Sequence, residues 1–129
     1  MSTTKFVLTQ GSTNEYFITI KQNDSTLPMV IDPTDTFTLK LYELSTGDEV
    51  LALDMTDGVN GQISVYDVNN GKLKLVFKQV AVDALKVERG DRADYYYSKP
   101  LYRLAIDANT VNNGEFLATI DKVYVQWQK

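Results

Sequence analysis

The sequence predicts an all-β fold, an antiparallel immunoglobulin-like β-sandwich of about eight strands with one short crossover helix. Apolar and polar residues alternate with a period of two in segment after segment, which is typical of half-buried strands. Turn residues, including Asn-Gly and Asp-Gly pairs, separate these segments about every ten residues. A small barrel stays an alternative, because strand number alone does not separate the two architectures. With 129 residues, 43% of them hydrophobic, we expect one domain over 1–129.

The first strands and the segment after them follow from local pattern. Lys5 to Thr9 is short and apolar, which predicts an edge strand. Asn14 to Gln22 alternates, with Phe17 on the side opposite its aliphatic residues, where it would cover a second surface. Leu27 to Pro33 is an apolar passage between two prolines, which limit it to an edge or a crossing segment.

The middle of the chain carries three further strands. Asp35 to Leu44 has the cleanest alternation, and Glu49 to Asp57 continues it after a Gly-containing turn. A short strand around Ile63 and Val65 lies between Asn60-Gly61 and the Asn-rich turn that ends at Gly71.

The stretch from Asn70 to Asp107 predicts strand, short helix, loop and strand. Its helical segment is Gln79 to Val87. The final strand, Glu115 to Trp127, holds two apolar sets that are out of phase. A bulge near Asp121-Lys122 would reconcile them, since one extra residue reverses the facing; otherwise Leu117 and Thr119 face the core throughout. The inward positions of these strands predict a core that includes Leu39, Leu53, Leu75, Phe77, Leu104 and Ile106.

Composition argues against several function classes. The chain has no Cys and no His, which removes thiolate nucleophiles, sulfur-ligated metals and any Ser-His-Asp arrangement. A net charge of −4 without clustered Lys and Arg disfavours nucleic-acid binding. No apolar run approaches the length of a membrane span, and the N-terminus lacks the apolar region of a secretory signal. We therefore expect no enzyme activity, no cofactor and no membrane or nucleic-acid partner.

Acidic residues near predicted turns are the first candidates for a site. Asp32, Asp35, Asp54, Asp57 and Asp67 with Asn69 could supply oxygen ligands for calcium. None completes the spacing of a calcium loop, and Asp and Asn at turns also bond to their own backbone. Turn capping is the simpler interpretation.

Tyrosines supply the other candidates. Tyr95, Tyr96 and Tyr97 follow one another, and neighbours on a strand alternate in facing, so at least one is exposed or covered by a partner. Such residues, or Trp127, could form a sugar-stacking or protein-binding surface. Tyr102 could instead serve as a tyrosine-corner residue near the start of its strand.

A charged loop precedes the tyrosines. Arg89-Gly90-Asp91 spells a cell-adhesion tripeptide, which a glycine turn between charged residues also explains. With Arg92 and the three tyrosines it lies in the segment from Val87 to Pro100, which is longer than the fold needs. The candidate interface is therefore Arg89, Arg92, Tyr95, Tyr96 and Tyr97.

Several segments in this order resemble a known family. They are the turn Thr9-Gln10-Gly11-Ser12-Thr13, the strand Tyr16 to Ile20, the strand Asn70 to Leu75, the helical Asp83-Ala84-Leu85, the strand Tyr102 to Asp107 and the closing strand Gly114 to Val125. The chain thereby resembles the small β-sandwich domains at the N-terminus of tailed-bacteriophage baseplate upper proteins and related tail-fibre proteins. The resemblance implies a non-catalytic domain that anchors components of a virion.

Two functions follow as expectations. The first is a non-enzymatic structural protein of a tailed-phage virion, made in the bacterial cytoplasm and acting in the baseplate, tail or head as an accessory or adaptor. The resemblance implies that its partners are other virion proteins, with a homo-oligomer in a symmetric assembly. The alternative is a carbohydrate-binding β-sandwich module that uses exposed tyrosines.

Overall fold

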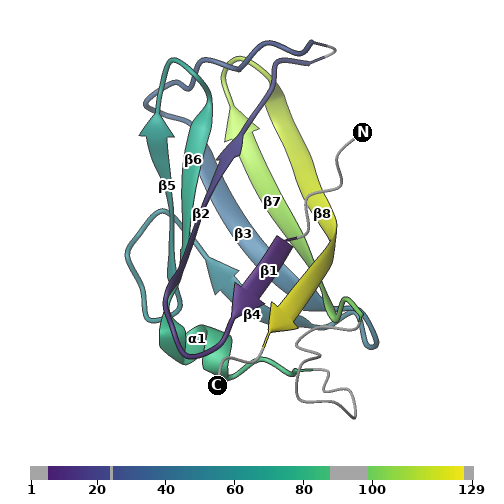
Figure 1. Ribbon diagram of the computed structural model, residues 1–129. Helices are drawn as coiled ribbons and strands as arrows, with labels where there is room; N and C mark the ends of the chain where they lie inside the picture. Colours follow the sequence, from purple (N-terminus) through teal and green to yellow (C-terminus); the bar gives the residue numbers. More distant parts are fainter. Residues whose placement is uncertain (1–5, 24, 88–98, 127–129) are drawn as a thin grey trace.

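The computed structural model describes residues 6–23, 25–87 and 99–126, which form two β-sheets packed face to face (Figure 1). One sheet has the strand order β1-β8-β7-β3-β4 and the other has the order β2-β6-β5. The elements are β1 Phe6–Thr9, β2 Asn14–Thr19, β3 Thr36–Glu43, β4 Glu49–Leu53, β5 Gly61–Asp67, β6 Lys72–Phe77, α1 Gln79–Asp83, β7 Tyr102–Thr110 and β8 Gly114–Gln126.

This strand order is that of an immunoglobulin-like sandwich. In the seven-strand form of that fold, the third strand pairs with the sixth, which pairs with the seventh, in one sheet. The second strand lies with the fourth and fifth strands in the other sheet. Here β3 lies beside β7, which pairs with β8, and β2 lies with β6 and β5 in the second sheet. The predicted all-β immunoglobulin-like sandwich is therefore confirmed, and the barrel alternative is wrong.

The sheets are antiparallel except at one edge. Strand β1 pairs in parallel with the last part of β8, in a register that aligns Phe6 with Val123 and Leu8 with Val125. The expectation of a purely antiparallel sandwich thus needs a correction at this edge. The N-terminal strand crosses to the sheet that holds the C-terminal strand, and β1 covers a backbone edge that β8 would otherwise expose.

The core lies between the sheets and follows the period-two pattern of the sequence. Strand β3 alternates exposed and buried residues along most of its length, and β6 alternates in the same way. All six residues predicted as core are buried: Leu39, Leu53, Leu75, Phe77, Leu104 and Ile106. The side-chain facing read from alternation is correct in both sheets.

The proline-bounded passage crosses between the sheets. It joins β2 in one sheet to β3 in the other, and an isolated β-bridge links its Pro28 to Lys21. Met29 and Ile31 point into the core and are buried. Their backbone N–H groups donate to Ile20 O and Val68 O, both at 2.9 Å, so the passage is held on both sides. The predicted crossing segment is confirmed.

The predicted bulge in β8 is present. Leu104 aligns with Ile120, but Tyr102 aligns with Val123, so β8 holds one extra residue at Asp121-Lys122. Before the bulge the partly buried side chains are Phe116, Ala118 and Ile120; after it, Val123 and Val125 are fully buried. Leu117 is 59% exposed, so the alternative in which it faces the core is wrong.

The helix is shorter than predicted. It spans Gln79–Asp83 instead of continuing to Val87. A longer helix would require the Lys86 N–H to donate to Val82 O, whereas it donates to the Tyr102 hydroxyl at 2.8 Å. The Leu85 N–H already donates to Val82 O at 3.1 Å, three residues back, so the α-helical bonding ends before Lys86. Within the described ranges, no helix is long and apolar enough to cross a membrane.

Candidate functional site

The candidate interface residues Arg89, Arg92, Tyr95, Tyr96 and Tyr97 lie outside the described residues, and so do the Arg-Gly-Asp tripeptide and Trp127. The flanks of that segment are described. Val87 precedes it, and Lys99 and Pro100 follow it, at the end of the sandwich that carries α1 (Figure 1). The surface around these flanks is the first candidate site.

A small polar cluster fixes this end. The Lys86 ammonium lies 2.9 Å from Glu43 Oε2, while the Lys86 backbone N–H donates to the Tyr102 hydroxyl at 2.8 Å. The hydrogen bond from Lys86 lowers the pKa of Glu43, and the same contact raises the pKa of Lys86. Burial raises the pKa of Tyr102. Tyr102 lies at the start of β7 and bonds back to upstream backbone, so the predicted tyrosine-corner role is confirmed.

Apolar surface surrounds this cluster. Two cavities, of about 430 and 350 Å³, share Glu43, Lys86 and Tyr102 in their walls. Buried Leu51, Ala81 and Leu85 line the smaller one, and exposed aliphatic side chains border both. We call the surface formed by the two cavities and the exposed Leu44, Val50 and Val80 the α1-end groove. Its make-up, an apolar centre with the Glu43–Lys86 ion pair at its side, is typical of protein-binding surfaces.

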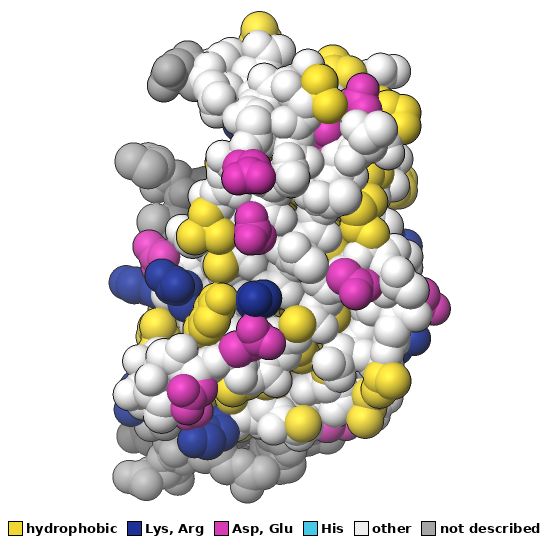
Figure 2. Space-filling view, turned by 180° about the vertical axis from the view of Figure 1, so that it is seen from behind, with side chains coloured by type: hydrophobic (Ala, Val, Ile, Leu, Met, Phe, Trp, Pro, Cys, Tyr) yellow, Lys and Arg dark blue, Asp and Glu magenta, His cyan; other side chains and the backbone are white. Residues whose placement is uncertain are grey.

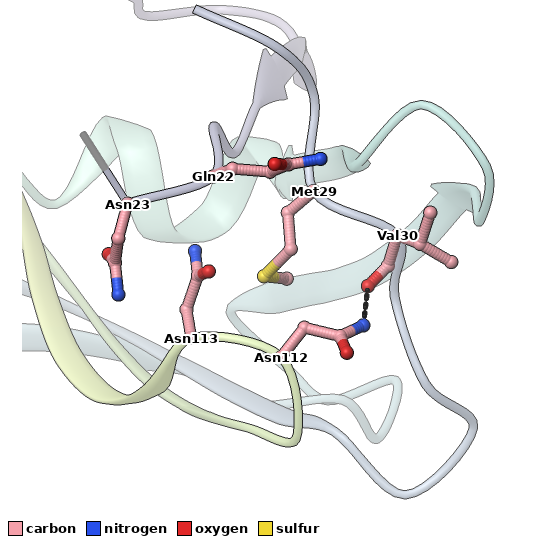
Figure 3. A pocket seen from close by; sticks show the side chains of 6 residues that line it. All are labelled: Gln22, Asn23, Met29, Val30, Asn112 and Asn113. Atoms are coloured by element: carbon pink, nitrogen blue, oxygen red, sulfur yellow. Dashed lines mark hydrogen bonds between the residues drawn. The ribbon is translucent and has the colours of Figure 1, made fainter. Parts of the chain in front are cut away.

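The opposite end of the sandwich holds a polar pocket of about 410 Å³, shown in Figure 3. Its walls come from the β2–β3 connection and the β7–β8 turn. They consist of Gln22, Asn23, Met29, Val30, Asn112 and Asn113, and we call this cavity the amide pocket.

Side-chain amides hold the walls of this pocket together. Asn112 Nδ2 donates to Val30 O at 2.6 Å and Asn113 Nδ2 donates to Lys21 O at 2.9 Å, which ties the two loops to each other (Figure 3). Gln22 Nε2 donates to Pro28 O at 3.2 Å within the first loop. Among the residues that the structure describes, those that line this pocket are carboxamides and apolar side chains.

Four of the five acidic candidates accept hydrogen bonds at turns, and the fifth, Asp57, pairs with Lys78 at 3.0 Å. Asp32 Oδ1 accepts from the Thr34 hydroxyl at 2.6 Å, and this bond lowers the pKa of Asp32. Asp54 and Asp67 accept backbone N–H groups two residues further along. Buried Asp35 accepts from Asp32 N at 2.9 Å and from Val111 N at 2.8 Å. Among the described residues, no three acidic side chains group as a metal site would require.

Sequence reasoning missed the amide pocket. Its residues belong to segments that are far apart in the sequence, and Asn112 is 82 positions from Val30, to which it bonds. The available signal was the fold itself, because an immunoglobulin-like order places the loop after the second strand beside the loop before the last strand. With that order, two clusters of carboxamides predict one polar site.

Two aromatic side chains are exposed on the outer face of the three-stranded sheet. Phe17 of β2 is 50% exposed and Tyr66 of β5 is 61% exposed, and their ring centroids lie 4.6 Å apart in an edge-to-face arrangement. The rings contact each other across β6, the middle strand of this sheet. Phe17 therefore covers a second surface, as its place in the alternation predicts.

The outer face of the five-stranded sheet is mixed in character. β2 and β6 cross in front of β3 in Figure 1, so Figure 2 views the molecule from the side of the five-stranded sheet. Charges of both signs lie among hydrophobic side chains there (Figure 2). Lys40 pairs with Glu49 at 3.4 Å, and the Arg103 guanidinium lies 5.5 Å from the centre of the Tyr42 ring. This face lacks the single-sign field that steers a charged ligand.

Comparison with known proteins leaves the family of this chain open. No family model and no curated protein matches it. Among solved structures, it is similar to a chain in the crystal structure of the ZIG-8–RIG-5 IG1–IG1 heterodimer. The identity is 12% and the TM-score is 0.39, over 99% of this chain and 84% of the other. A likeness at that level carries no argument, and the fold assignment stands on the strand order above.

Proposed function

We propose that this protein is a non-enzymatic structural protein of a tailed-phage virion that joins neighbouring virion proteins through the α1-end groove. The resemblance of its strand motifs to baseplate upper and tail-fibre domains supports the virion setting. The groove supports the mode of action, which is protein–protein contact in a symmetric assembly. On this proposal the protein is located in the virion, as one component of the particle.

The observation that carries the docking role is the exposed aliphatic border of the groove. Val80 is 61% exposed and, with Val50, lies beside the buried Leu51 and Leu85 that line the cavity. Covering such a surface would remove apolar area from water, at about 25 cal/mol for each Å² buried. A partner with a complementary aliphatic anchor would fill the cavity and leave the Glu43–Lys86 pair at the rim.

A charge placed on this border tests the docking role. We expect Val80→Asp to weaken binding to virion partners by about tenfold or more, because the partner would have to desolvate a carboxylate. Val111→Asp is the matched control, since Val111 is 65% exposed and lies at the opposite end of the sandwich. Both variants should retain the circular dichroism spectrum of the wild type.

The measurement is co-sedimentation with purified phage particles and pull-down of the proteins encoded by neighbouring genes. Light scattering after size exclusion measures self-association of the same variants. If Val80→Asp and Val111→Asp bind alike, the groove is the wrong surface. If immunogold labelling and mass spectrometry find the protein absent from purified particles, the virion role is wrong.

Carbohydrate binding is the second candidate, and the exposed Phe17–Tyr66 pair favours it. Exposed aromatic rings on a sheet face offer an apolar surface on which a sugar ring can stack. The tyrosines at 95–97 lie outside the described residues, so this pair provides the aromatic surface. A glycan array with wild type, Tyr66→Ala and Tyr96→Ala tests the idea, and binding that survives both substitutions would exclude aromatic stacking by either set.

A further inference from the structure

We infer that the amide pocket is a binding site for a neutral saccharide unit, recognised through its hydroxyl groups. The pocket lies at the opposite end from the α1-end groove and shares no residue with the Phe17–Tyr66 pair. The inference therefore goes beyond the proposed docking role and does not depend on it.

The pocket is held open by bonds that leave recognition groups unused. Gln22, Asn112 and Asn113 each commit a side-chain N–H to a backbone carbonyl. A carboxamide has two N–H donors and an oxygen with two lone pairs, so each of these amides keeps a second donor and acceptor capacity. Because the first bond fixes the amide plane, little rotamer freedom remains to be lost when a ligand binds.

The lining selects an uncharged ligand. The six described lining side chains are neutral, so among them no opposite charge would compensate for the desolvation of an anion or a cation. Asn23 adds a fourth carboxamide at the wall. The amides thus present donors and acceptors side by side, with no net charge.

Hydroxyl groups match this pattern best. A hydroxyl donates and accepts through the same atom, so adjacent hydroxyls of a sugar can bond to the N–H and the C=O of neighbouring amides. A peptide group presents one donor and one acceptor that point in opposite directions, and it would satisfy fewer of these amides. Met29 is fully buried beneath the pocket, so the carboxamides of the two loops form the surface that a ligand would contact.

Size and access agree with this assignment. A volume of about 410 Å³ falls in the range of roughly 300–1,000 Å³ for small-molecule sites. Exposed Val30 lies in the wall, and exposed Val111 directly precedes Asn112 in the β7–β8 turn. An extended glycan could therefore place one unit in the pocket and continue over this rim.

Nuclear magnetic resonance tests the inference directly, because side-chain NH₂ groups give their own signals. Methyl glucoside, methyl mannoside and N-acetylglucosamine would be titrated to about 10 mM, enough to detect weak, millimolar binding. We expect at least one sugar to shift the side-chain NH₂ signals of the four lining carboxamides, with saturation: Gln22, Asn23, Asn112 and Asn113. Glucuronate and N-methylacetamide serve as the charged and the peptide-like probes and should shift them less.

Variants decide whether the pocket is responsible. Asn23 makes none of the three hydrogen bonds that hold the loops together, so its substitution should leave the loops in place. Asn23→Ala removes one recognition group and should weaken sugar binding about fivefold or more. Asn23→Trp should fill the pocket and block sugar binding. Asn69→Ala, in the neighbouring β5–β6 turn, and Tyr66→Ala should bind as wild type does.

Three results would overturn the inference. They are the absence of a saturable shift with every neutral sugar, wild-type affinity in Asn23→Trp, and stronger binding of glucuronate or N-methylacetamide. Sugar binding that is lost in Tyr66→Ala and kept in Asn23→Trp would assign the ligand to the aromatic pair instead. None of these results bears on the α1-end groove, which the Val80→Asp experiment tests separately.

Discussion

Removing the Tyr102 hydroxyl should cost about 1.5 kcal/mol of unfolding free energy. The ring is 2% exposed and stays in place in Tyr102→Phe, so packing is unchanged and only the hydrogen bond from Lys86 N, 2.8 Å long, is lost. A hydrogen bond contributes about 0.5–1.5 kcal/mol net, and a buried donor left unpaired costs about 1–3 kcal/mol. The Lys86 N–H is partly buried, which places the expected loss where these two ranges overlap.

Urea unfolding followed by circular dichroism measures this loss. The midpoint should fall while the slope stays constant, because the surface exposed on unfolding does not change. Tyr66→Phe is the control, since its ring is exposed, and it should change the unfolding free energy by less than about 0.5 kcal/mol. A Tyr102→Phe variant as stable as Tyr66→Phe would refute the view that this bond anchors the chain after α1.

Three other predictions concern the core, a turn and pH. Phe77→Ala should lose about 3 kcal/mol in the same urea assay, because the side chain is fully buried; a loss under about 1 kcal/mol would contradict the assigned facing. Gly71→Ala should lose about 3 kcal/mol, since φ is +62° and a Cβ would lie 2.6 Å from Ile20 O and Met29 O; Gly47→Ala, with φ +77° and open space, should lose about 1 kcal/mol. Burial raises the pKa of Tyr16 and Tyr102, so the unfolded chain releases the phenolic protons at lower pH than the folded chain does. The stability that the two neutral phenols contribute is therefore complete below about pH 10 and is lost as the pH rises above it. Urea midpoints measured across that range should fall with pH, and midpoints that stay constant would contradict the prediction.

Much of the fold was predictable because side-chain facing is a local property of a strand. The alternation in β3 and β6 identified the buried positions, and the phase change in β8 located a bulge at Asp121-Lys122 before any partner strand was known. Strand partners are not local. Nothing in Phe6–Thr9 itself states that the strand lies parallel to the end of β8, since an isolated edge strand can pair in either direction.

The helix and the candidate sites were less predictable, for the same reason. The helical pattern continues through Val87, whereas in the structure the Lys86 N–H bonds to Tyr102, which lies 16 residues further along the chain. The amide pocket and the Phe17–Tyr66 pair each combine segments that only the tertiary fold brings together. The segment that the sequence marked as the interface lies outside the described residues, and its role stays a prediction.

The parallel pairing of β1 with β8 has a mechanical consequence. The two strands run in the same direction, so tension applied ahead of Phe6 and after Gln126 pulls them lengthwise past each other. The backbone bonds between them, including the one from Gln10 N to Gln126 O at 2.9 Å, then share the force instead of opening one after another. A component mounted by these two ends would resist stretching through its shortest strand, and pulling on single molecules would show rupture of this pair as the first force peak.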